Sequence, residues 1–360
     1  MLFAGGGTGG HVYPSLAVAR ALEDDLRSRG EPLEMLYVGI RGRVDEQIVP
    51  REGIPFRAIA AGQLRVSSPR AFVRGIVRLA RGIVQSLSIV RSFRPDAVFA
   101  TGGYASVPVG VAARMLRRPL VVYLPDVTPG WAVRLLSRLA TRMTTTSEAA
   151  IPHLPAGRTS VVGYPVRAEF WRYDHASARN ALGLPSYTPM LLIAAGSLGA
   201  RAINDAVIAS LPRLLKRAVV LHMTGSGDEE RALEARTRLS PEAQKRYLVR
   251  AYIDDMPAAM HAADLVVCRS GASTLGELPA AGAAAILIPG QYEGWSQAPN
   301  AEYLQAHDAA LILGDRDLGD LVLQLLDDPA RLESMRAAAR ALARPGAAVD
   351  IARVLQEVAA

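Results

Sequence analysis

The chain has 360 residues, 50% of them hydrophobic and 21% charged, which is typical of a globular protein with room for two domains and excludes a disordered chain. The net charge of +7 comes almost entirely from arginine, so an anionic partner is expected: nucleic acid, a phosphate-rich substrate or an anionic membrane surface. The single cysteine, Cys268, excludes an internal disulfide and lies in an apolar stretch, where a small buried side chain is expected.

The start of the chain predicts a phosphate-binding loop. A short apolar strand over residues 1–4 runs into the glycine-rich loop 5–11, and a helix is predicted over 13–29. A glycine loop that opens a helix presents free backbone N–H groups and the positive end of the helix dipole, which suits a phosphate. No secretion signal precedes the loop and no apolar run approaches about 18 residues, so we expect a cytoplasmic protein without a membrane span.

Alternating strands and helices follow, and this alternation predicts a parallel, doubly wound sheet. The expected elements are a helix over 105–116 and strands over 33–38, 54–59, 97–100 and 120–123. Another strand-to-helix glycine loop, Thr101-Gly102-Gly103-Tyr104, stands before that helix. The alternation breaks near residue 163, where a strand runs into glycine and proline, so we expect two domains, 1–163 and 167–360.

Residues 69–94 predict a basic amphipathic helix. Its arginines fall in one stripe beside a wide apolar face: Arg70, Arg74, Arg78 and Arg81. Such a helix is typical of one that lies in a membrane interface, and the alternative is a helix packed on the sheet with a solvated arginine face. The lack of interleaved aromatic residues argues against nucleic acid. In the membrane interpretation the contacting residues are Phe72, Arg74, Ile76, Arg78 and Leu79.

The second domain repeats the pattern of the first. A strand over 190–195 precedes a glycine turn over 196–201 and a helix from residue 202. Further strands are expected over 221–224 and 248–250, with a helix over 255–263. Beyond residue 313 the chain is expected to be helical, and its last helix is able to pack back on the first domain.

The stretch from 264 to 282 is the strongest candidate for a ligand site. A buried strand over 264–268 runs into a small, hydroxyl-rich turn over 269–274. The helix that follows is closed by Gly282 as a C-terminal cap. Glu277 lies about one turn into this helix, where a carboxylate can reach a sugar hydroxyl beside bound phosphates.

A second buried strand over 285–289 ends in a polar loop over 290–299. Ligands of open α/β sheets bind at the carboxyl ends of strands, so both loops lie where a ligand is expected. Together with the loop 5–11, they predict two domains that face one nucleotide-bearing ligand. The alternative is an ordinary strand–helix–strand unit whose loops only turn the chain.

Six motifs stand out in combination: Gly5-Gly6 with Thr8-Gly9-Gly10-His11 and Pro14, Thr101-Gly102-Gly103-Tyr104, Gly196-Ser197-Leu198-Gly199-Ala200-Arg201, Tyr252-Ile253-Asp254-Asp255-Met256, Arg269-Ser270-Gly271-Ala272-Ser273-Thr274, and Glu277. They closely resemble the bacterial MurG family of glycosyltransferases, and the resemblance covers almost the whole chain. That family transfers N-acetylglucosamine (GlcNAc) from UDP-GlcNAc to lipid I, a muramyl-pentapeptide pyrophosphoryl-undecaprenol, and so makes lipid II.

The resemblance implies a GT-B fold, in which two Rossmann-like, doubly wound α/β domains face a cleft, and inversion at the anomeric carbon. It implies a peripheral enzyme on the cytoplasmic face of the cell membrane that acts in peptidoglycan synthesis without a cofactor. The implied partners are UDP-GlcNAc, lipid I, the anionic inner membrane surface and other cell-wall enzymes, with no nucleic acid.

The resemblance also implies roles for single residues. The backbone of Ile253 would contact the uracil, and the Glu277 carboxylate would hold the ribose hydroxyls. The group around the donor diphosphate would be Ser197, Ala272, Ser273 and Thr274, with the positive charge of Arg167. The amino sugar would be contacted by Gln297 and Asn300. The acceptor diphosphate and the reacting carbon would be faced by Thr8, Gly9, Gly10 and His11.

Two stretches depart from the family pattern. Leu124-Pro125-Asp126 stands where most relatives have Glu-Gln-Asn, so Asp126 takes the place of an amide that contacts the donor sugar or the acceptor. Gly290-Gln291-Tyr292 replaces the usual Phe-Gln-His.

His11 is the candidate base for the acceptor hydroxyl, because an imidazole with an ordinary pKa near about 6.5 is largely neutral at pH 7. The alternative for His11 is a cap or a phosphate contact, and Asp126 is either a rival base or a group that orients His11. Helix dipoles, hydroxyls and Arg167 would hold the departing diphosphate, so no metal is required. Asp254-Asp255 is better explained as the start of a helix than as a metal motif.

Three other functions remain open. A related transferase would use the same donor site with diacylglycerol as its acceptor. A UDP-GlcNAc 2-epimerase would share the fold and need no lipid, although the basic helix argues against it. A non-enzymatic nucleotide-binding module would bind UDP without turnover.

Overall fold

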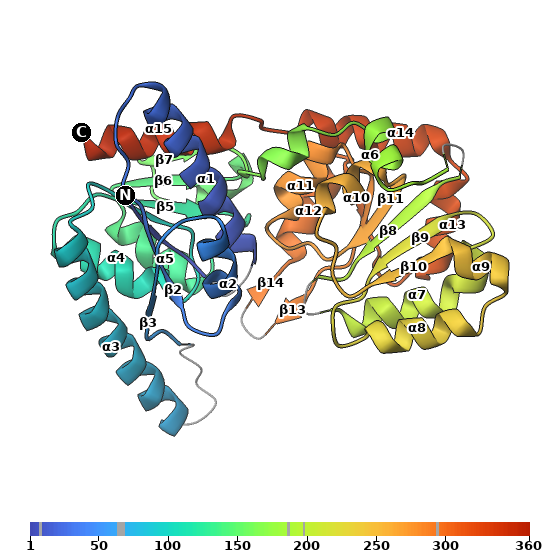
Figure 1. Ribbon diagram of the computed structural model, residues 1–360, viewed down its shortest axis with the longest axis horizontal. Coiled ribbons are helices and arrows are strands. Elements are labelled where there is room, and N and C mark those ends of the chain that lie inside the picture. The colour runs from blue at the N-terminus through green and yellow to red at the C-terminus, as the bar shows by residue number, and fades with distance from the viewer. Residues whose placement is uncertain (7–8, 63–68, 186–187, 197–198, 293–294) are drawn as a thin grey trace. The chain divides into compact units, whose positions relative to one another are not determined.

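The computed structural model describes residues 1–6, 9–62, 69–185, 188–196, 199–292 and 295–360. The chain forms two compact units, one of Met1–Arg167 with Arg344–Ala360 and one of Ala168–Ala343. Each unit has a central sheet with helices packed on it (Figure 1). The C-terminal segment from Arg344 therefore belongs to the same unit as the start of the chain.

The first unit contains a parallel sheet. In the described part of the chain its strands follow the order β3-β2-β1-β4-β5-β6-β7. These strands are β1 (Leu2–Ala4), β2 (Leu36–Ile40), β3 (Phe56–Ile59), β4 (Val98–Ala100), β5 (Leu120–Leu124), β6 (Arg142–Thr145) and β7 (Thr159–Val161). The central strands are continuous apolar runs that are buried throughout, as expected for a sheet covered on both faces.

The helices of the first unit include one from the far end of the sequence. They are α1 (Gly9–Ser28), α2 (Val44–Arg51), α3 (Pro69–Phe93), α4 (Ser106–Met115), α5 (Trp131–Leu139), the 3-10 helix η1 (Glu148–His153) and α15 (Ala347–Ala359). Helix α15 packs on α1, where Ile351 and Leu355 are fully buried. The Gln356 amide adds a hydrogen bond of 2.6 Å to the Asp25 carboxylate.

The second unit repeats this architecture, with strands in the order β10-β9-β8-β11-β12-β15 in its described part. The parallel strands are β8 (Met190–Ala194), β9 (Val219–Met223), β10 (Tyr247–Arg250), β11 (Leu265–Cys268), β12 (Ala285–Leu287) and β15 (Ala310–Ile312), and a separate pair is β13 (Gln291–Tyr292) with β14 (Trp295–Ser296). The helices are η2 (Ala168–Trp171), α6 (His175–Ala181), α7 (Arg201–Leu214), α8 (Glu229–Thr237), α9 (Pro241–Arg246), α10 (Met256–Ala262), α11 (Thr274–Ala281), α12 (Ala298–Ala306), α13 (Leu318–Leu326) and α14 (Pro329–Ala341). The prediction of two α/β domains with parallel, doubly wound sheets is confirmed.

Strand order explains where the glycine loops lie. In each sheet the direction of winding reverses once, between β1 and β4 in the first unit and between β8 and β11 in the second. Loops that leave the carboxyl ends of the strands at such a switch point diverge and leave room for a ligand. The predicted glycine loops and the hydroxyl-rich turn follow these four strands.

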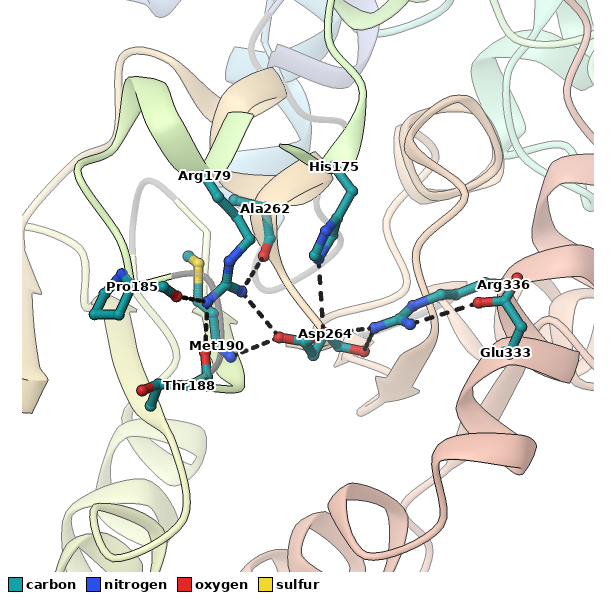
Figure 2. A network of polar contacts seen from close by, with 9 residues as sticks. All are labelled: His175, Arg179, Pro185, Thr188, Met190, Ala262, Asp264, Glu333 and Arg336. Atoms are coloured by element: carbon teal, nitrogen blue, oxygen red, sulfur yellow. Dashed lines mark hydrogen bonds and ion pairs between the residues drawn. The ribbon is translucent and has the colours of Figure 1, made fainter. Parts of the chain in front are cut away.

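The opposite edge of the second sheet, where β8 and β11 begin, is held by a cluster of charges around Asp264 (Figure 2). Its carboxylate accepts hydrogen bonds from the Met190 N–H at 2.8 Å, the Arg179 guanidinium at 3.1 Å and the Arg336 guanidinium at 2.9 Å. The Arg179 side chain is buried, and it also donates to the carbonyls of Ala262, Pro185 and Thr188. This cluster joins the starts of two central strands to α6 and α14.

The structure corrects the predicted bounds of one loop and one helix, and it confirms two predicted helix caps. The loop predicted over 290–299 contains the antiparallel pair β13–β14, and α12 already begins at Ala298. Helix α1 begins at Gly9, four residues before its predicted start, which places His11 in the first turn. Gly282 is confirmed as the C-terminal cap of α11, with a left-handed φ of 57°, and Asp255 as the N-cap of α10.

Among the described residues, no helix is both long and apolar enough to cross a membrane.

Candidate functional site

In the first unit, the loops after β1 and β4 pack backbone to backbone around His11. Gly102 and Gly103 have left-handed φ values of 93° and 77°, which a side chain would strain. A Cβ on Gly103 would lie 2.5 Å from the Gly6 carbonyl oxygen, and one on Gly102 would lie 3.3 Å from the His11 ring. Glycine is therefore required for these loops to approach each other this closely.

The His11 ring has a fixed tautomer. Its Nδ1 lies 2.8 Å from the Thr101 carbonyl oxygen, and the Thr101 hydroxyl donates back to the His11 carbonyl at 2.8 Å. Because a carbonyl only accepts, Nδ1 carries the proton and Nε2 keeps the basic lone pair. Burial lowers the pKa of His11, against the opposing effects of the Asp126 charge and the Thr101 hydrogen bond, so the ring is neutral at pH 7.

Asp126 follows β5 and acts electrostatically on His11, since its charge is one of the groups that raise the His11 pKa. The turn that carries Asp126 is held from beneath by buried hydroxyls. The Tyr123 hydroxyl lies 2.7 Å from the Thr146 hydroxyl, and the Thr146 hydroxyl donates to the Pro125 carbonyl at 2.8 Å. The structure thus brings His11, Thr101 and Asp126 together.

Sequence reasoning missed Asp45, which lies against Gly6 of the first glycine loop. Asp45 lies in α2 with no exposed surface, and its carboxylate accepts the Ile40 N–H at 2.8 Å. A Cβ on Gly6 would come within 2.6 Å of the same carboxylate. The sequence offered one signal for this role, a lone aspartate after the β2 loop. An aspartate at this position is equally typical of an ordinary helix start, so its place in the sequence could not reveal the role.

Gly9 and Gly10, predicted to face the acceptor, open α1. Arg167 falls in the first unit, where its guanidinium carbon lies 4.7 Å from the centre of the Tyr13 ring. Two predicted site residues, Thr8 and Ser197, lie outside the described residues.

In the second unit, the turn between β11 and α11 is built to present backbone N–H groups. The Thr274 N–H and hydroxyl both donate to the Gly271 carbonyl, at 3.0 Å and 2.6 Å. Among the described residues, the N–H groups of Gly271, Ala272 and Ser273 meet no protein acceptor. Three such groups at a helix start form a site for an anion.

Glu277 and Ile253 flank this turn. Glu277 lies in the first turn of α11, and its charge adds to burial in raising the pKa of Cys268 at the end of β11. Ile253 lies between β10 and α10 with its side chain buried, so its backbone is the part placed to meet a ligand.

Gln297 and Asn300 are buried and bind the protein backbone. The Gln297 side-chain oxygen accepts the Gly290 N–H at 2.9 Å, and the Asn300 amide donates to the Ser270 carbonyl at 3.0 Å. The Ser270 hydroxyl donates to the Gln297 carbonyl at 2.9 Å. These contacts join the turn after β11 to the loop after β12, a role that their Gln-x-x-Asn spacing did not predict.

Helix α3 divides into two halves. Toward its C-terminus it packs on the sheet and on α4, with Ser86, Ile89 and Val90 buried. Its N-terminal half extends away from the rest of the first unit (Figure 1). Four apolar residues in this half are strongly exposed, Phe72, Val73, Ile76 and Val77, and Arg70, Arg74, Arg78 and Arg81 are exposed too. Leu79 differs from them, because it is partly buried against the core.

Among the described residues, no group of three or more His, Cys, Asp or Glu side chains is arranged to hold a metal ion.

Two family profiles and the curated relatives place the chain among the same glycosyltransferases. Profiles of the glycosyltransferase family 28 N-terminal and C-terminal domains match residues 1–145 and 190–352. The UDP-N-acetylglucosamine--N-acetylmuramyl-(pentapeptide) pyrophosphoryl-undecaprenol N-acetylglucosamine transferase of Roseiflexus sp. (strain RS-1) is 39% identical, over 98% of this chain and 93% of the relative. The enzyme of the same name from Desulforudis audaxviator is 37% identical, over 100% of this chain and 98% of the relative.

Solved structures agree on the fold. The crystal structure of Acinetobacter baumannii MurG matches with a TM-score of 0.73 and 23% identity, over 99% of both chains. The UDP-GlcNAc 2-epimerase of Neisseria meningitidis, solved with UDP-GlcNAc, matches with a TM-score of 0.69 and 13% identity, over 99% of both chains. At these identities the likeness concerns the fold, and the predicted GT-B fold is confirmed.

Proposed function

The chain belongs to glycosyltransferase family 28, and we propose that it transfers GlcNAc from UDP-GlcNAc to lipid I to form lipid II. The observation that carries this proposal is similarity over the whole length to enzymes named for that transfer. A match over whole chains includes both the donor and the acceptor side, which a shared fold alone would not do.

The second unit is proposed to hold the donor. Backbone N–H groups at the start of α11, with Ala272, Ser273 and Thr274, suit the diphosphate. Glu277 would accept hydrogen bonds from the ribose hydroxyls, and the backbone of Ile253 would read the uracil. Gln297 and Asn300 would contact the amino sugar while holding the loops in place. Arg167, which belongs to the first unit, would add positive charge to the diphosphate.

The first unit is proposed to supply the base. The acceptor hydroxyl oxygen attacks the anomeric carbon, the bond to UDP breaks with its electron pair leaving on the diphosphate, and the hydroxyl proton goes to His11 Nε2. Support comes from the tautomer, which leaves Nε2 free to accept, and from the lowered pKa, which keeps it neutral. The Asp126 carboxylate would stabilise the imidazolium once it forms. Asp126 itself remains the alternative base.

The projecting half of α3 is proposed to dock on the anionic, cytoplasmic face of the cell membrane. Its exposed apolar residues would enter the interface while the arginines bind lipid phosphates. An acceptor with an undecaprenyl chain stays in the bilayer, so this docking would bring the enzyme to its substrate.

The direct test is transfer of labelled GlcNAc from UDP-GlcNAc to a soluble lipid I analogue. We expect a product with inverted, β anomeric configuration and one UDP released for each transfer. A parallel reaction with diacylglycerol, and one without any acceptor that is analysed for epimerised UDP-sugar, serve as controls. Glycosylated diacylglycerol or an epimerised sugar, with an unmodified lipid I analogue, would overturn the proposal.

A further inference from the structure

The antiparallel pair β13–β14 carries two stacked aromatic rings beside the donor turn. Tyr292 pairs with Trp295 across the two strands, and their ring centres lie 5.2 Å apart at an interplanar angle of 27°. The Tyr292 side chain is 50% exposed, and Trp295 is partly exposed. Large aromatic residues on a protein surface are typical of contact sites.

Arginine fixes the orientation of this pair. The Arg269 guanidinium donates a hydrogen bond of 3.1 Å to the Tyr292 hydroxyl and lies 5.9 Å from the centre of the same ring. A Cβ on Gly290 would lie 2.3 Å from that guanidinium, so glycine leaves the space it needs. The rings are therefore held in one orientation before any ligand binds.

The aromatic pair is also attached to the anion-binding turn. Arg269 is the first residue after β11 and lies two residues before Gly271, the first of the three residues that present free N–H groups. At the base of the pair of strands, Gly290 and Gln297 exchange two hydrogen bonds of 2.9 Å. The Ser270 hydroxyl donates a hydrogen bond to the Gln297 carbonyl, which connects the turn to the loop that carries the aromatic pair.

The strand order indicates which part of a UDP-sugar would reach the rings. β10, which precedes the Ile253 loop, lies at one end of the sheet, and the switch point between β8 and β11 lies in the middle. The aromatic pair follows β12, on the far side of β11 from β10. With the base toward β10 and the diphosphate at the switch point, the hexose extends toward β12.

We propose that Tyr292 and Trp295 form a stacking platform for the hexosyl ring of the donor and so help to determine which UDP-sugar is used. The platform rests on the proposed function, because it assumes a UDP-sugar in the second unit. One face of a pyranose ring carries only C–H groups, and an aromatic ring covers such a face without leaving hydroxyl groups unpaired.

Dissociation constants for UDP and for UDP-GlcNAc, measured by calorimetry, test the platform. We expect Trp295→Ala to weaken UDP-GlcNAc binding about tenfold and to leave UDP binding within about twofold, since only the sugar loses a contact. Trp295→Phe should recover most of the loss. The matched control is Trp171→Ala, which removes an indole that is 40% exposed elsewhere on the second unit.

Each other outcome decides against the platform. Equal weakening of UDP and UDP-GlcNAc by Trp295→Ala would mean that the rings contact the nucleotide or that the turn has been disturbed. Unchanged binding of both would mean that they contact neither. If the parent protein does not bind UDP-GlcNAc at all, the proposed function fails; if the parent transfers GlcNAc and Trp295→Ala retains its affinity, only the platform fails.

Discussion

At the scale of single residues, His11 combines two properties that a base needs. Its Nδ1 is committed to the Thr101 carbonyl, so the lone pair on Nε2 is the only basic site of the ring. Its lowered pKa means that the ring stays neutral in weakly acidic solution, where an ordinary histidine would gain a proton. The tautomer is fixed by the loop after β4, about 90 residues away in the chain, and the lowered pKa comes from burial of the ring.

The pH dependence of kcat/KM tests this assignment. The base is active only when neutral, so activity is lost as the pH falls through the pKa of His11 in the folded protein. Because that pKa lies below its ordinary value of 6.5, activity should persist below pH 6.5 and fall only at lower pH. His11→Ala should lower kcat by about 10²–10⁴-fold with unchanged UDP affinity.

Asp126→Asn separates the two candidate bases. The Asp126 charge raises the pKa of His11, so its removal should lower that pKa further and move the acidic limb of the profile to lower pH. This variant should remain active at pH 7 if His11 is the base. Loss of all turnover in Asp126→Asn, with His11→Ala still active, would reverse the roles.

The residues of the site differ in how far the sequence predicted them. His11 and Glu277 could be named because each lies in or just after a small-residue turn at the carboxyl end of a strand, where ligands of α/β sheets bind, and because these turns resemble those of the MurG family. The backbone contacts of Gln297 and Asn300 could not be predicted, since their partners Gly290 and Ser270 meet them only after two neighbouring strands pair. Asp45 was missed for the same reason: Gly6, against which its carboxylate lies, is about 40 residues away, in another loop.

At the scale of elements, the Asp264 cluster shows how a charge stabilises the edge of the sheet opposite the candidate site (Figure 2). Burial alone would raise the pKa of Asp264. The contacts from His175, the Met190 N–H and Arg336 outweigh burial and lower it to about 2. Removal of the carboxylate charge would leave the buried Arg179 guanidinium without its counter-charge.

Asp264→Asn should therefore lower the free energy of unfolding by about 3–5 kcal/mol, measured by urea denaturation at pH 7. In the parent protein the contribution of Asp264 is present above its unfolded pKa of about 3.9 and is lost as the pH falls toward 2, so the two proteins should converge in stability over that window. Asp320→Asn, which breaks an exposed pair with Arg213, should change stability little. Equal effects of the two substitutions would contradict this account.

The projecting half of α3 predicts salt-sensitive binding to anionic vesicles. Each arginine near such a surface contributes about 1 kcal/mol, and this attraction weakens as salt screens it. Val73→Glu with Val77→Glu should reduce vesicle binding at least tenfold, because both side chains are well exposed and would carry charge into the interface. Leu79 is left unchanged, since it packs on the core.

The control for α3 is Val349→Glu, at a valine on α15 that is 50% exposed, close to the 58% and 60% of Val73 and Val77. It should leave vesicle binding intact, and neither variant should alter the melting temperature or transfer to a soluble acceptor. Vesicle binding that is the same for the α3 variant and the parent would mean that this half of the helix does not dock on membranes.

Some short elements were predicted from the sequence because a glycine turn or an N-cap marked them, such as α10 and α11, and others without such a mark were not. Helices α2, α5, α8 and α9 went unnamed because six to nine residues carry too few turns for a clear pattern. The strands β13 and β14 have two residues each, which is too short for alternation to be visible. The loop predicted over 290–299 overlaps the start of α12, where Pro299 lies in the first turn, a common position for proline in a helix.

At the scale of the whole molecule, each unit places its candidate loops at its own topological switch point. Two α/β domains could be predicted because short apolar strands alternate with segments that have the apolar spacing of a helix. The segment from Arg344 belongs to the first unit, because α15 packs on α1, nearly the whole chain away, and its Ile351 and Leu355 are fully buried. Which residues of α15 are buried could not be predicted, since their partners lie so far away in the sequence.

This division predicts how the chain can be cut. A fragment of residues 1–167 lacks α15 and would expose the surface that α15 covers. The lost burial of Ile351 and Leu355 alone corresponds to roughly 3–6 kcal/mol. Domains have a total free energy of unfolding of only about 5–15 kcal/mol. This fragment should therefore melt at a much lower temperature than the whole protein and bind a hydrophobic dye. Residues 168–343 contain a complete unit and should fold alone.

A matched fragment isolates the effect of α15. A Cβ on Gly163 would lie 2.4 Å from Arg344 Cβ, so a short glycine–serine linker can join residue 167 to residue 344 within the first unit. Fragment 1–167 linked to 344–360 should regain a cooperative thermal transition, followed by circular dichroism, and lose the dye binding. The same linked fragment with Ile351→Asp and Leu355→Asp in its C-terminal segment should not regain the cooperative transition. An equally cooperative transition in all three fragments would mean that α15 is dispensable for the first unit.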